Sequence, residues 1–439
     1  MQPLVNTKYT DSPVNSFNDW DFFSGPSDTF INVACNFFWL QQTFLQSMTI
    51  QNRYRIQSID LLRGIVMIIM ALDHTRDFIH YGNSIDQDPL DLTTTTPILF
   101  MTRWITHFCA PVFVFLSGTS IFLYSSKGKT KKQVATFLFS RGLFLMLAQI
   151  IIMAPVWDAT YRVLNLQVIW AIGLCMVLLS VLQFLPYRLL LITGLLIVFG
   201  HNLLDNIVID KPVWESFLWS TVHSENQYLL QERLMVIMQY PFLSLLGLMI
   251  LGYAAGKLYL PGTNAAFRRK VLRNSGIASI VLFIVIRWLN VYGDLHPWKI
   301  QNTVLFTIFD FVKTTKYPAS LLFILMTMGP ALVLLSVLEN VSGSLSKLIR
   351  IYGKVPFFYY ILHVLLLHSI ALVLFFASGH SWSDLDFIHF REGSLPYGSG
   401  HSLWMVYLVW IAVVVILYFP CRWYGKYKST NNFWWLSYI

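Results

Sequence analysis

The sequence contains few charged residues for its length. Only 12% of its 439 residues are charged, whereas 56% are hydrophobic and the mean hydropathy is +0.57. Soluble domains carry about 25% charged residues, so an ordinary soluble domain is excluded. The net charge of +9 could suggest a nucleic-acid partner, but the basic residues fall in short segments between apolar runs. This distribution is typical of membrane topology and gives no support for nucleic-acid binding.

Several motifs of soluble enzymes and metal sites are also missing. The four cysteines, Cys35, Cys109, Cys175 and Cys421, are scattered, with no metal or redox spacing. There is no His-Glu-x-x-His motif, no phosphate-binding loop and no Rossmann glycine pattern. Metal chemistry and nucleotide hydrolysis therefore have little support, and we expect no metal cofactor. No internal repeat or second soluble domain is found.

What the sequence has instead is a series of apolar runs of about 20 residues, the length that crosses a bilayer. These runs predict an all-α, polytopic membrane helix bundle with about ten transmembrane helices in a single domain, residues 51–430, before a tail, residues 431–439. The predicted spans are 59–81, 98–124, 134–155, 165–184, 187–204, 234–256, 271–291, 317–338, 355–376 and 402–421.

The first 50 residues form a separate segment. They begin polar and turn-rich, lack the basic start of a signal peptide, and contain an apolar stretch, residues 31–47, that is too short to span comfortably. Met48 begins a short basic leader directly before the first predicted helix, as a natural bacterial start does. We therefore predict that residues 1–50 are a poorly structured leader or an upstream mis-start.

The basic residues predict the orientation of the chain. Most of the 31 Lys and Arg residues fall in one set of loops and ends, for example 127–132 and 268–273. By the positive-inside rule these loops are cytoplasmic, so both termini are predicted to be cytoplasmic. None of the 11 histidines lies in a predicted cytoplasmic loop. We therefore expect the polar chemistry toward the outer face of the membrane.

The first predicted helix ends in a dense cluster of ionisable residues. After an uninterrupted apolar run come Asp73, His74, Arg76, Asp77 and His80. A charge at membrane depth costs about 2.5–3.5 kcal/mol on insertion scales, so this density needs a shared reason. The spacing places Asp73, Asp77 and His80 on one helix face, and a carboxylate beside an imidazole fixes its tautomer and raises its basicity. We favour a catalytic group over an interfacial salt bridge between Asp73 and Arg76.

The second predicted helix has polar residues at the same end. Arg103 and His107 are four residues apart, and Pro111 interrupts the hydrogen-bond ladder one turn later. We expect this helix end to line a cavity, while His107 stays open between a site residue and a helix-contact histidine. Arg63 lies three helical turns before His74, about 16 Å away along the helix. Taken alone, Arg63 is best explained as an orientation signal.

Two later segments add further candidates. Asp310, Lys313 and Tyr317 can share one helix face before the eighth span. Lys313 and Lys316 can hold an anionic substrate or merely pair with Asp310. His363 lies inside the ninth span, where it must hydrogen-bond within the bundle.

Four motifs resemble the bacterial branch of the heparan-alpha-glucosaminide N-acetyltransferase-like family of transmembrane acyltransferases. They are SIDLLRGIVMIIMALDHTRDF, TRWITHFCAPVFVFLSGTS, KYPASLLFILMTMGPALVLL and GKVPFFYYILH, and the similarity runs from about residue 53 to 425. The resemblance implies transfer of an acetyl group from cytoplasmic acetyl-CoA to a sugar amine or hydroxyl on the far side of the membrane. It also implies that cations such as Arg63 and Arg141 hold the CoA phosphates.

The resemblance further implies a catalytic histidine between the first two helices. The matching region offers His80, flanked by His74 and His107, and Asp73 or Asp77 can orient the imidazole. That imidazole acts as a general base or as a transient acetyl carrier. The residues that we expect to bind substrate are Arg76, Arg103, Lys313, Lys316, Tyr317 and His363.

The expected location is the bacterial inner membrane. The expected partners are membrane lipid and a glycan or lipid-linked sugar acceptor, with a homodimer as one assembly to test. A proton-coupled small-molecule permease is an alternative, because Asp and His groups also form proton relays in transporters, although no inverted repeat is found. A non-catalytic membrane subunit is a second alternative, and it predicts that alanine at His74, His80 and His107 changes no phenotype.

Overall fold

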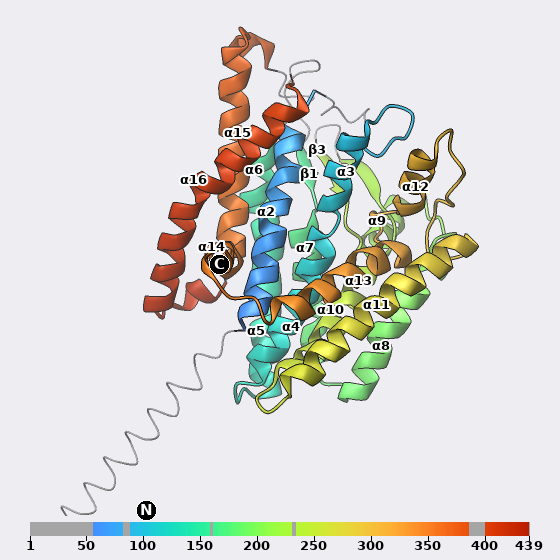
Figure 1. The fold of residues 1–439 in the computed structure, drawn as a ribbon, viewed down its shortest axis with the longest axis vertical. Coiled ribbons are helices and arrows are strands. Elements are labelled where there is room, and N and C mark those ends of the chain that lie inside the picture. Colours follow the sequence, from blue (N-terminus) through green and yellow to red (C-terminus); the bar gives the residue numbers. More distant parts are fainter. Residues whose placement is uncertain (1–55, 82–87, 159–160, 231–233, 386–399, 439) are drawn as a thin grey trace, which may run out of the picture. The chain divides into compact units, whose positions relative to one another are not determined.

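A computed structural model of the chain describes residues 56–81, 88–158, 161–230, 234–385 and 400–438. The described residues belong to one compact unit, residues 56–439. The predicted leader, residues 1–50, lies outside them. The described part is a helix bundle with one small sheet (Figure 1).

The elements are numbered here in chain order. The α-helices are α2 Gln57–Ile79, α3 Pro97–Thr106, α4 Cys109–Ser125, α5 Lys131–Ala148, α6 Ala154–Asp158, α7 Val168–Leu182, α8 Tyr187–Gly200, α9 Val213–Val222, α10 Phe242–Ala255, α11 Ala265–Leu289, α12 Val304–Val312, α13 Leu321–Leu338, α14 Ser344–Lys354, α15 Pro356–Ala377 and α16 Leu403–Thr430. The strands are β1 Val163–Asn165, β2 Asn226–Leu230 and β3 Leu234–Met238. The short helical turns are η1 Gln149–Met153, η2 His201–Leu204, η3 Gly256–Tyr259, η4 Trp382–Asp384 and η5 Trp434–Ser437.

Eight helical segments of the described part are long and apolar enough to cross a membrane. Helix α2 and the shorter apolar helix α7 lie where two further spans are predicted. The prediction of an all-α, polytopic membrane bundle is therefore confirmed. The eight segments are Pro97–Ser125, Lys131–Trp157, Tyr187–Leu204, Phe242–Tyr259, Ala265–Leu289, Leu321–Leu338, Pro356–Ala377 and Leu403–Thr430.

The first part of the predicted sixth span is wrong. Residues 234–238 form strand β3, and the helix begins only at Phe242. Pro241 lacks an N–H and disfavours a helical conformation for the residue before it, so the helix cannot start earlier without losing a hydrogen bond. Strand β3 lies between β1, to which it is parallel, and β2, to which it is antiparallel.

Of two other local predictions, one is confirmed and one needs correction. The second predicted span, 98–124, lies in the membrane segment Pro97–Ser125, and the predicted interruption is present: α3 gives way to α4 at residues 107–108, because Pro111 cannot donate to the carbonyl of His107, four residues earlier. The predicted common face of Asp310, Lys313 and Tyr317 does not form, because α12 ends at Val312 and Lys313 is extended. Helix α13 begins at Leu321, after Ser320 accepts the N-cap hydrogen bond from the Phe323 N–H.

Helix α2 contacts six of the other helices. It packs against α3, α4, α13, α14, α15 and α16, and Figure 1 shows α15 and α16 on one side of it and α10, α11 and α13 on the other. Gly64 lets α2 approach α14, since a Cβ there would meet the backbone carbonyl of Ile349. The C-terminal end of α2 therefore lies inside the protein, beside the small sheet.

Candidate active site

A cavity with a volume of about 100 Å³ lies beside the last turns of α2. One water needs roughly 10–15 Å³ of such volume, so the cavity can hold several waters or a small group such as an acetyl. Its walls come from α2, α3, α4, α6, α15, the residues after β1 and β3, and the segment before α13. Six predicted site residues line it: Asp73, His74, Asp77, Arg103, Lys316 and Tyr317.

The carboxylates of this cavity are paired with arginines. Arg103 Nη1 lies 2.5 Å from Asp73 Oδ2, and Arg76 Nη2 lies 3.2 Å from Asp73 Oδ1. Arg76 also donates a hydrogen bond to Asp77. Both charges of each pair are taken from water, so they are stabilised chiefly by each other. The sequence expects Asp73 and Asp77 to orient an imidazole, but in the structure these carboxylates bind guanidinium groups instead.

The imidazole of His74 is oriented by a second histidine. His74 Nδ1 lies 2.6 Å from His363 Nε2, and His363 Nδ1 lies 2.9 Å from the backbone carbonyl of Tyr359. A carbonyl only accepts, so His363 carries its proton on Nδ1 and presents the lone pair of Nε2. His74 therefore donates from Nδ1 and keeps an unprotonated Nε2. A nitrogen in this state can accept a proton or attack a carbonyl carbon.

Aromatic and amide side chains that the sequence did not single out complete this wall. The rings of Trp157 and Tyr360 lie edge-on to His74, with centroids 4.8 Å and 6.0 Å away. Tyr360 Oη receives the indole N–H of Trp157 at 3.3 Å and donates to Gln167 Oε1 at 3.2 Å. The parallel strands β1 and β3 end just before Gln167 and Gln239, and both side chains line the cavity. Because the sequence did not predict strands β1 and β3, it gave no indication that Gln167 and Gln239 reach the cavity.

The other two candidate histidines do not line the cavity. Helix α2 ends at Ile79, and extended His80 pairs through its backbone with the segment at His401. The His80 N–H still donates to the Arg76 carbonyl at 3.0 Å, so His80 caps the last turn of α2, but it does not line the cavity with Asp73 and Asp77. His107 is buried at the end of α3, with its ring centroid 5.4 Å from that of Phe323.

The segment before α13 brings one of the two predicted lysines to the cavity. Lys316 lines it, with Nζ 5.0 Å from the centre of the Tyr317 ring, and Tyr317 Oη lies 3.2 Å from Tyr240 Oη. Lys313 does not line it. The Asp310 carboxylate accepts from Lys299 N at 2.8 Å and Gln301 Nε2 at 2.9 Å. Neither lysine pairs with Asp310 within the described part, so that alternative is wrong.

The two cations assigned to CoA phosphates, Arg63 on α2 and Arg141 on α5, do not line the cavity. Arg63 Nη2 donates to Ser120 Oγ at 2.9 Å, and Arg63 Nη1 donates to the Gly353 carbonyl at 3.2 Å. Arg141 on α5 lies over the Phe137 ring at 5.9 Å and interacts electrostatically with Arg63. The two guanidinium groups thus form one basic region.

In the part of the chain that the structure describes, no three His, Cys, Asp or Glu side chains form a metal-binding group.

Comparison with known proteins adds a family to this geometry. No curated protein matches the chain. Residues 55–297, more than half of the chain, match the family described as heparan-alpha-glucosaminide N-acetyltransferase, catalytic. The match includes α2, α3 and the cavity residues up to Tyr240, while Lys316, Tyr317 and His363 lie beyond it. A buried imidazole with a free nitrogen fits acyl transfer, and the eight apolar helices fit an integral membrane protein. The chain belongs to the heparan-alpha-glucosaminide N-acetyltransferase catalytic family, which supports an acetyltransferase-type function in a membrane protein.

Proposed function

We propose that this protein transfers an acetyl group from cytoplasmic acetyl-CoA to a sugar amine or hydroxyl at the outer face of a bacterial inner membrane. The observation that carries the proposal is the imidazole of His74, which lines the cavity with Nδ1 held by His363. This arrangement leaves Nε2 as a base or nucleophile in a site that also contains neutral hydrogen-bonding side chains. The acceptor is a cell-envelope glycan or its lipid-linked precursor.

The reaction follows from the state of His74. As the acceptor nitrogen or oxygen attacks the acetyl carbonyl carbon, His74 Nε2 takes the proton that the acceptor loses. The carbonyl π electrons move to oxygen and form a tetrahedral intermediate. When this intermediate collapses, the carbon–sulfur bond breaks, and the imidazolium returns its proton to the CoA thiolate. The alternative route, in which His74 first takes the acetyl group, uses the same nitrogen and is distinguished by a burst of CoA release.

The donor enters from the other end of α2 in this proposal. Arg63 lies eleven residues before His74, about 16 Å along the helix at 1.5 Å per residue. Arg63 and Arg141 hold the CoA phosphates there, as guanidinium groups do well, and the thioester arm reaches toward His74. Transfer activity that appears when acetyl-CoA is added to inside-out vesicles, and not when it is added to right-side-out vesicles, supports this orientation. Equal activity in the two kinds of vesicle contradicts it.

The test is acetyl transfer by purified protein in lipid nanodiscs. Labelled acetyl-CoA is supplied with glucosamine, which offers an amine, or with N-acetylglucosamine, which offers only hydroxyls. We expect His74→Ala to lower kcat by about 10²- to 10⁴-fold, the range for loss of an acid–base group. His368→Ala is the matched control, because His368 lies on α15 near His363, bonds the Val156 carbonyl and does not line the cavity.

The same panel decides between the three candidate histidines. Loss of transfer in His80→Ala or His107→Ala, with His74→Ala active, would reassign the catalytic group. A folded wild-type protein that neither binds nor turns over acetyl-CoA would contradict the proposal. Proton-coupled uptake would then be measured to test the permease alternative.

A further inference from the structure

Lys316 differs from the other charged residues of the cavity because none of the described residues forms an ion pair with it. Asp73 and Asp77 are paired with Arg76 and Arg103. No Asp or Glu oxygen of the described residues lies within 4.0 Å of Lys316 Nζ. Lys316 is nevertheless close enough to Asp73 and His74 to interact with both electrostatically. The cavity thus contains one positive charge whose counter-ion is not supplied from the described part of the chain.

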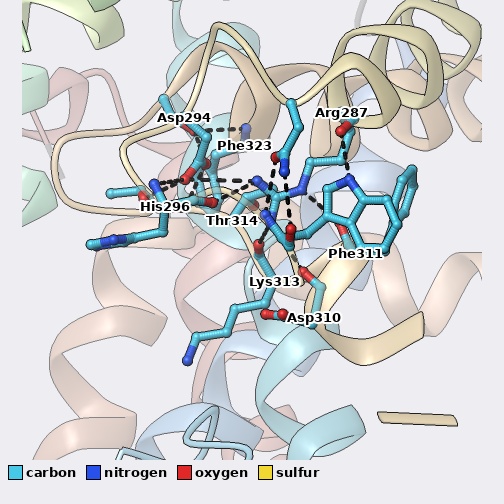
Figure 2. Close-up of polar contacts among 12 residues, drawn as sticks. Arg287, Asp294, His296, Asp310, Phe311, Lys313, Thr314 and Phe323 are labelled. Atoms are coloured by element: carbon cyan, nitrogen blue, oxygen red, sulfur yellow. Dashed lines mark hydrogen bonds and ion pairs between the residues drawn. The ribbon is translucent and has the colours of Figure 1, made fainter. Parts of the chain in front are cut away.

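The backbone that carries Lys316 is held by Asp294, whose polar contacts are drawn in Figure 2. Asp294 Oδ2 accepts from Thr315 N at 2.8 Å, and Asp294 Oδ1 accepts from Thr315 Oγ1 at 2.7 Å. Asp294 Oδ2 also accepts from Ser320 Oγ at 2.8 Å. Thr315 and Ser320 stand on either side of the Lys316–Tyr317 pair. One carboxylate therefore holds both ends of the short segment that reaches the cavity.

Arg287 holds the chain just before that segment. Its guanidinium is almost fully buried, with the side chain 2% exposed, and lies 4.0 Å from Asp294 Oδ1 (Figure 2). It donates to four backbone carbonyls, at 2.6–3.0 Å: those of His296, Asp310, Phe311 and Lys313. Three of these carbonyls belong to the end of α12, which a cation stabilises. The backbone around Lys316 is thus held in place by hydrogen bonds, unlike that of a lysine in an unsupported surface loop.

Acetyl transfer is favoured by a positive charge next to one atom, the carbonyl oxygen of the acetyl group. In either route to the product, the carbonyl oxygen of the acetyl group becomes an oxyanion when the tetrahedral intermediate forms. A preorganised cation at this oxygen lowers the barrier because the charge appears only in the transition state and the intermediate. Arg76 and Arg103 already have carboxylate counter-ions, whereas Lys316 has none among the described residues.

We propose that the Lys316 ammonium stabilises the oxyanion formed during acetyl transfer, and that Asp294 and Arg287 are positioning residues that hold Lys316 at the cavity. This inference rests on the proposed function and assigns a second catalytic group to the same site. The Lys316 Nζ–H donates to the oxyanion while the carbon–oxygen double bond is open, and it keeps its proton. When the double bond reforms and the thiolate leaves, the charge on the oxygen disappears.

The first experiment compares Lys316→Met with Lys316→Arg in the nanodisc assay. Methionine keeps the length of the side chain without its charge, and arginine keeps the charge. We expect Lys316→Met to lower kcat by about 10²- to 10³-fold, which is the effect of removing one oxyanion donor. The KM for acetyl-CoA and the KM for the sugar acceptor should both stay within about threefold of wild type. Lys316→Arg should recover part of this loss.

The second experiment tests the positioning role with two Asp→Asn changes in one loop. Asp294→Asn weakens the bonds to Thr315 and Ser320, whereas Asp310→Asn on α12 weakens the bonds to Lys299 N and Gln301 Nε2 and leaves those to Thr315 and Ser320 intact. We expect Asp294→Asn to lower kcat about tenfold and Asp310→Asn to leave it within about twofold. In the double variant with Lys316→Met, Asp294→Asn should lower kcat no further, because it acts through Lys316.

The outcomes separate this inference from the proposed function. Active wild-type protein with an active Lys316→Met variant overturns the oxyanion role and leaves the acetyltransferase intact. A loss confined to the acceptor KM also overturns it, because Lys316 would then bind the acceptor and not the transition state. An additive loss in the double variant overturns the positioning role of Asp294. Wild-type protein that binds acetyl-CoA without transferring the acetyl group overturns both proposals.

Discussion

Partly buried Arg103 and fully buried Arg287 belong to one membrane helix bundle, but their charges are compensated in different ways. Arg103 forms an ion pair with Asp73, and its Nε is buried with no hydrogen-bond partner in the described part. Arg287 uses Nε, Nη1 and Nη2 together on four backbone carbonyls. Arg103 thus keeps its Nε donor unused, whereas every nitrogen of the Arg287 guanidinium donates at least one hydrogen bond.

This difference separates chemistry from scaffolding. An ion pair with spare donors beside a cavity can rearrange when an anionic group arrives, because a new partner replaces the old one. A guanidinium bound to backbone carbonyls cannot release them without unfolding the loop that supplies them. Arg287 therefore holds the start of the segment 313–320, and Arg103 belongs to the cavity lining.

The largest expected effect is the loss of the Arg287 clamp. Arg287→Met leaves four carbonyls without their donor, and each buried unsatisfied group costs about 1–3 kcal/mol. We expect the free energy of unfolding to fall by about 4 kcal/mol or more, which thermal unfolding in detergent measures. Arg269→Met is the control, since exposed Arg269 bonds only the Asn340 side chain, and a loss within about 0.5 kcal/mol is expected. Equal losses would contradict the clamp.

A smaller effect is expected from the cavity ion pair. Asp73→Asn or Arg103→Gln leaves a buried charge with one partner fewer and should each cost about 3 kcal/mol of unfolding free energy. The double variant should cost less than the sum, with a coupling of about 1–3 kcal/mol, because the two residues are in contact. Equilibrium unfolding of the four proteins closes the cycle. Additive losses would show that Asp73 relies on Arg76 alone.

The comparison also shows which parts of the site follow from sequence. The apolar runs predict the bundle, and the charges after Leu72 predict that the end of α2 lines a cavity, because spacing within one helix is readable. The partnership of His74 with His363, 289 residues apart, is not readable, since periodicity says nothing about which helices meet. For the same reason the contacts of Arg287 with four backbone carbonyls could not be predicted.

The small sheet was missed for another reason. The sequence LMVIM at 234–238 is short and apolar, so it is equally compatible with the start of a membrane helix. Only Pro241 indicated that the helix begins later. The strand matters for function because β1 and β3 bring Gln167 and Gln239 to the cavity. Pairing of β1 with β3, whose partner residues such as Val163 and Met235 are 72 positions apart, depends on tertiary packing and not on local preference.

A third kind of partner, a neutral imidazole, gives an effect of intermediate size. His363→Leu removes the acceptor for His74 Nδ1 and lets His74 place its proton on either nitrogen. We expect kcat for acetyl transfer to fall about 10- to 100-fold, equivalent to about 1.4–2.7 kcal/mol, with unchanged acetyl-CoA binding. His368→Leu on the same helix provides the control. A fall in acetyl-CoA affinity without a change in kcat would contradict an orienting role.

The smallest effect on stability is expected for Asp91. Its carboxylate is exposed, so its hydrogen bonds act without burial. Asp91 Oδ1 accepts from Thr93 N at 2.9 Å and from Thr93 Oγ1 at 2.8 Å in the loop before α3. These bonds favour the ionised form and lower the pKa of the Asp91 carboxyl. The stability they give is present above the ordinary pKa of about 3.9 and is lost as the pH falls through the lowered value. Asp91→Asn should therefore cost under about 1 kcal/mol at pH 6, and the gap from wild type should narrow toward pH 3. Thermal unfolding at the two pH values measures this, and a gap of constant size would mean that the carboxylate charge makes no contribution.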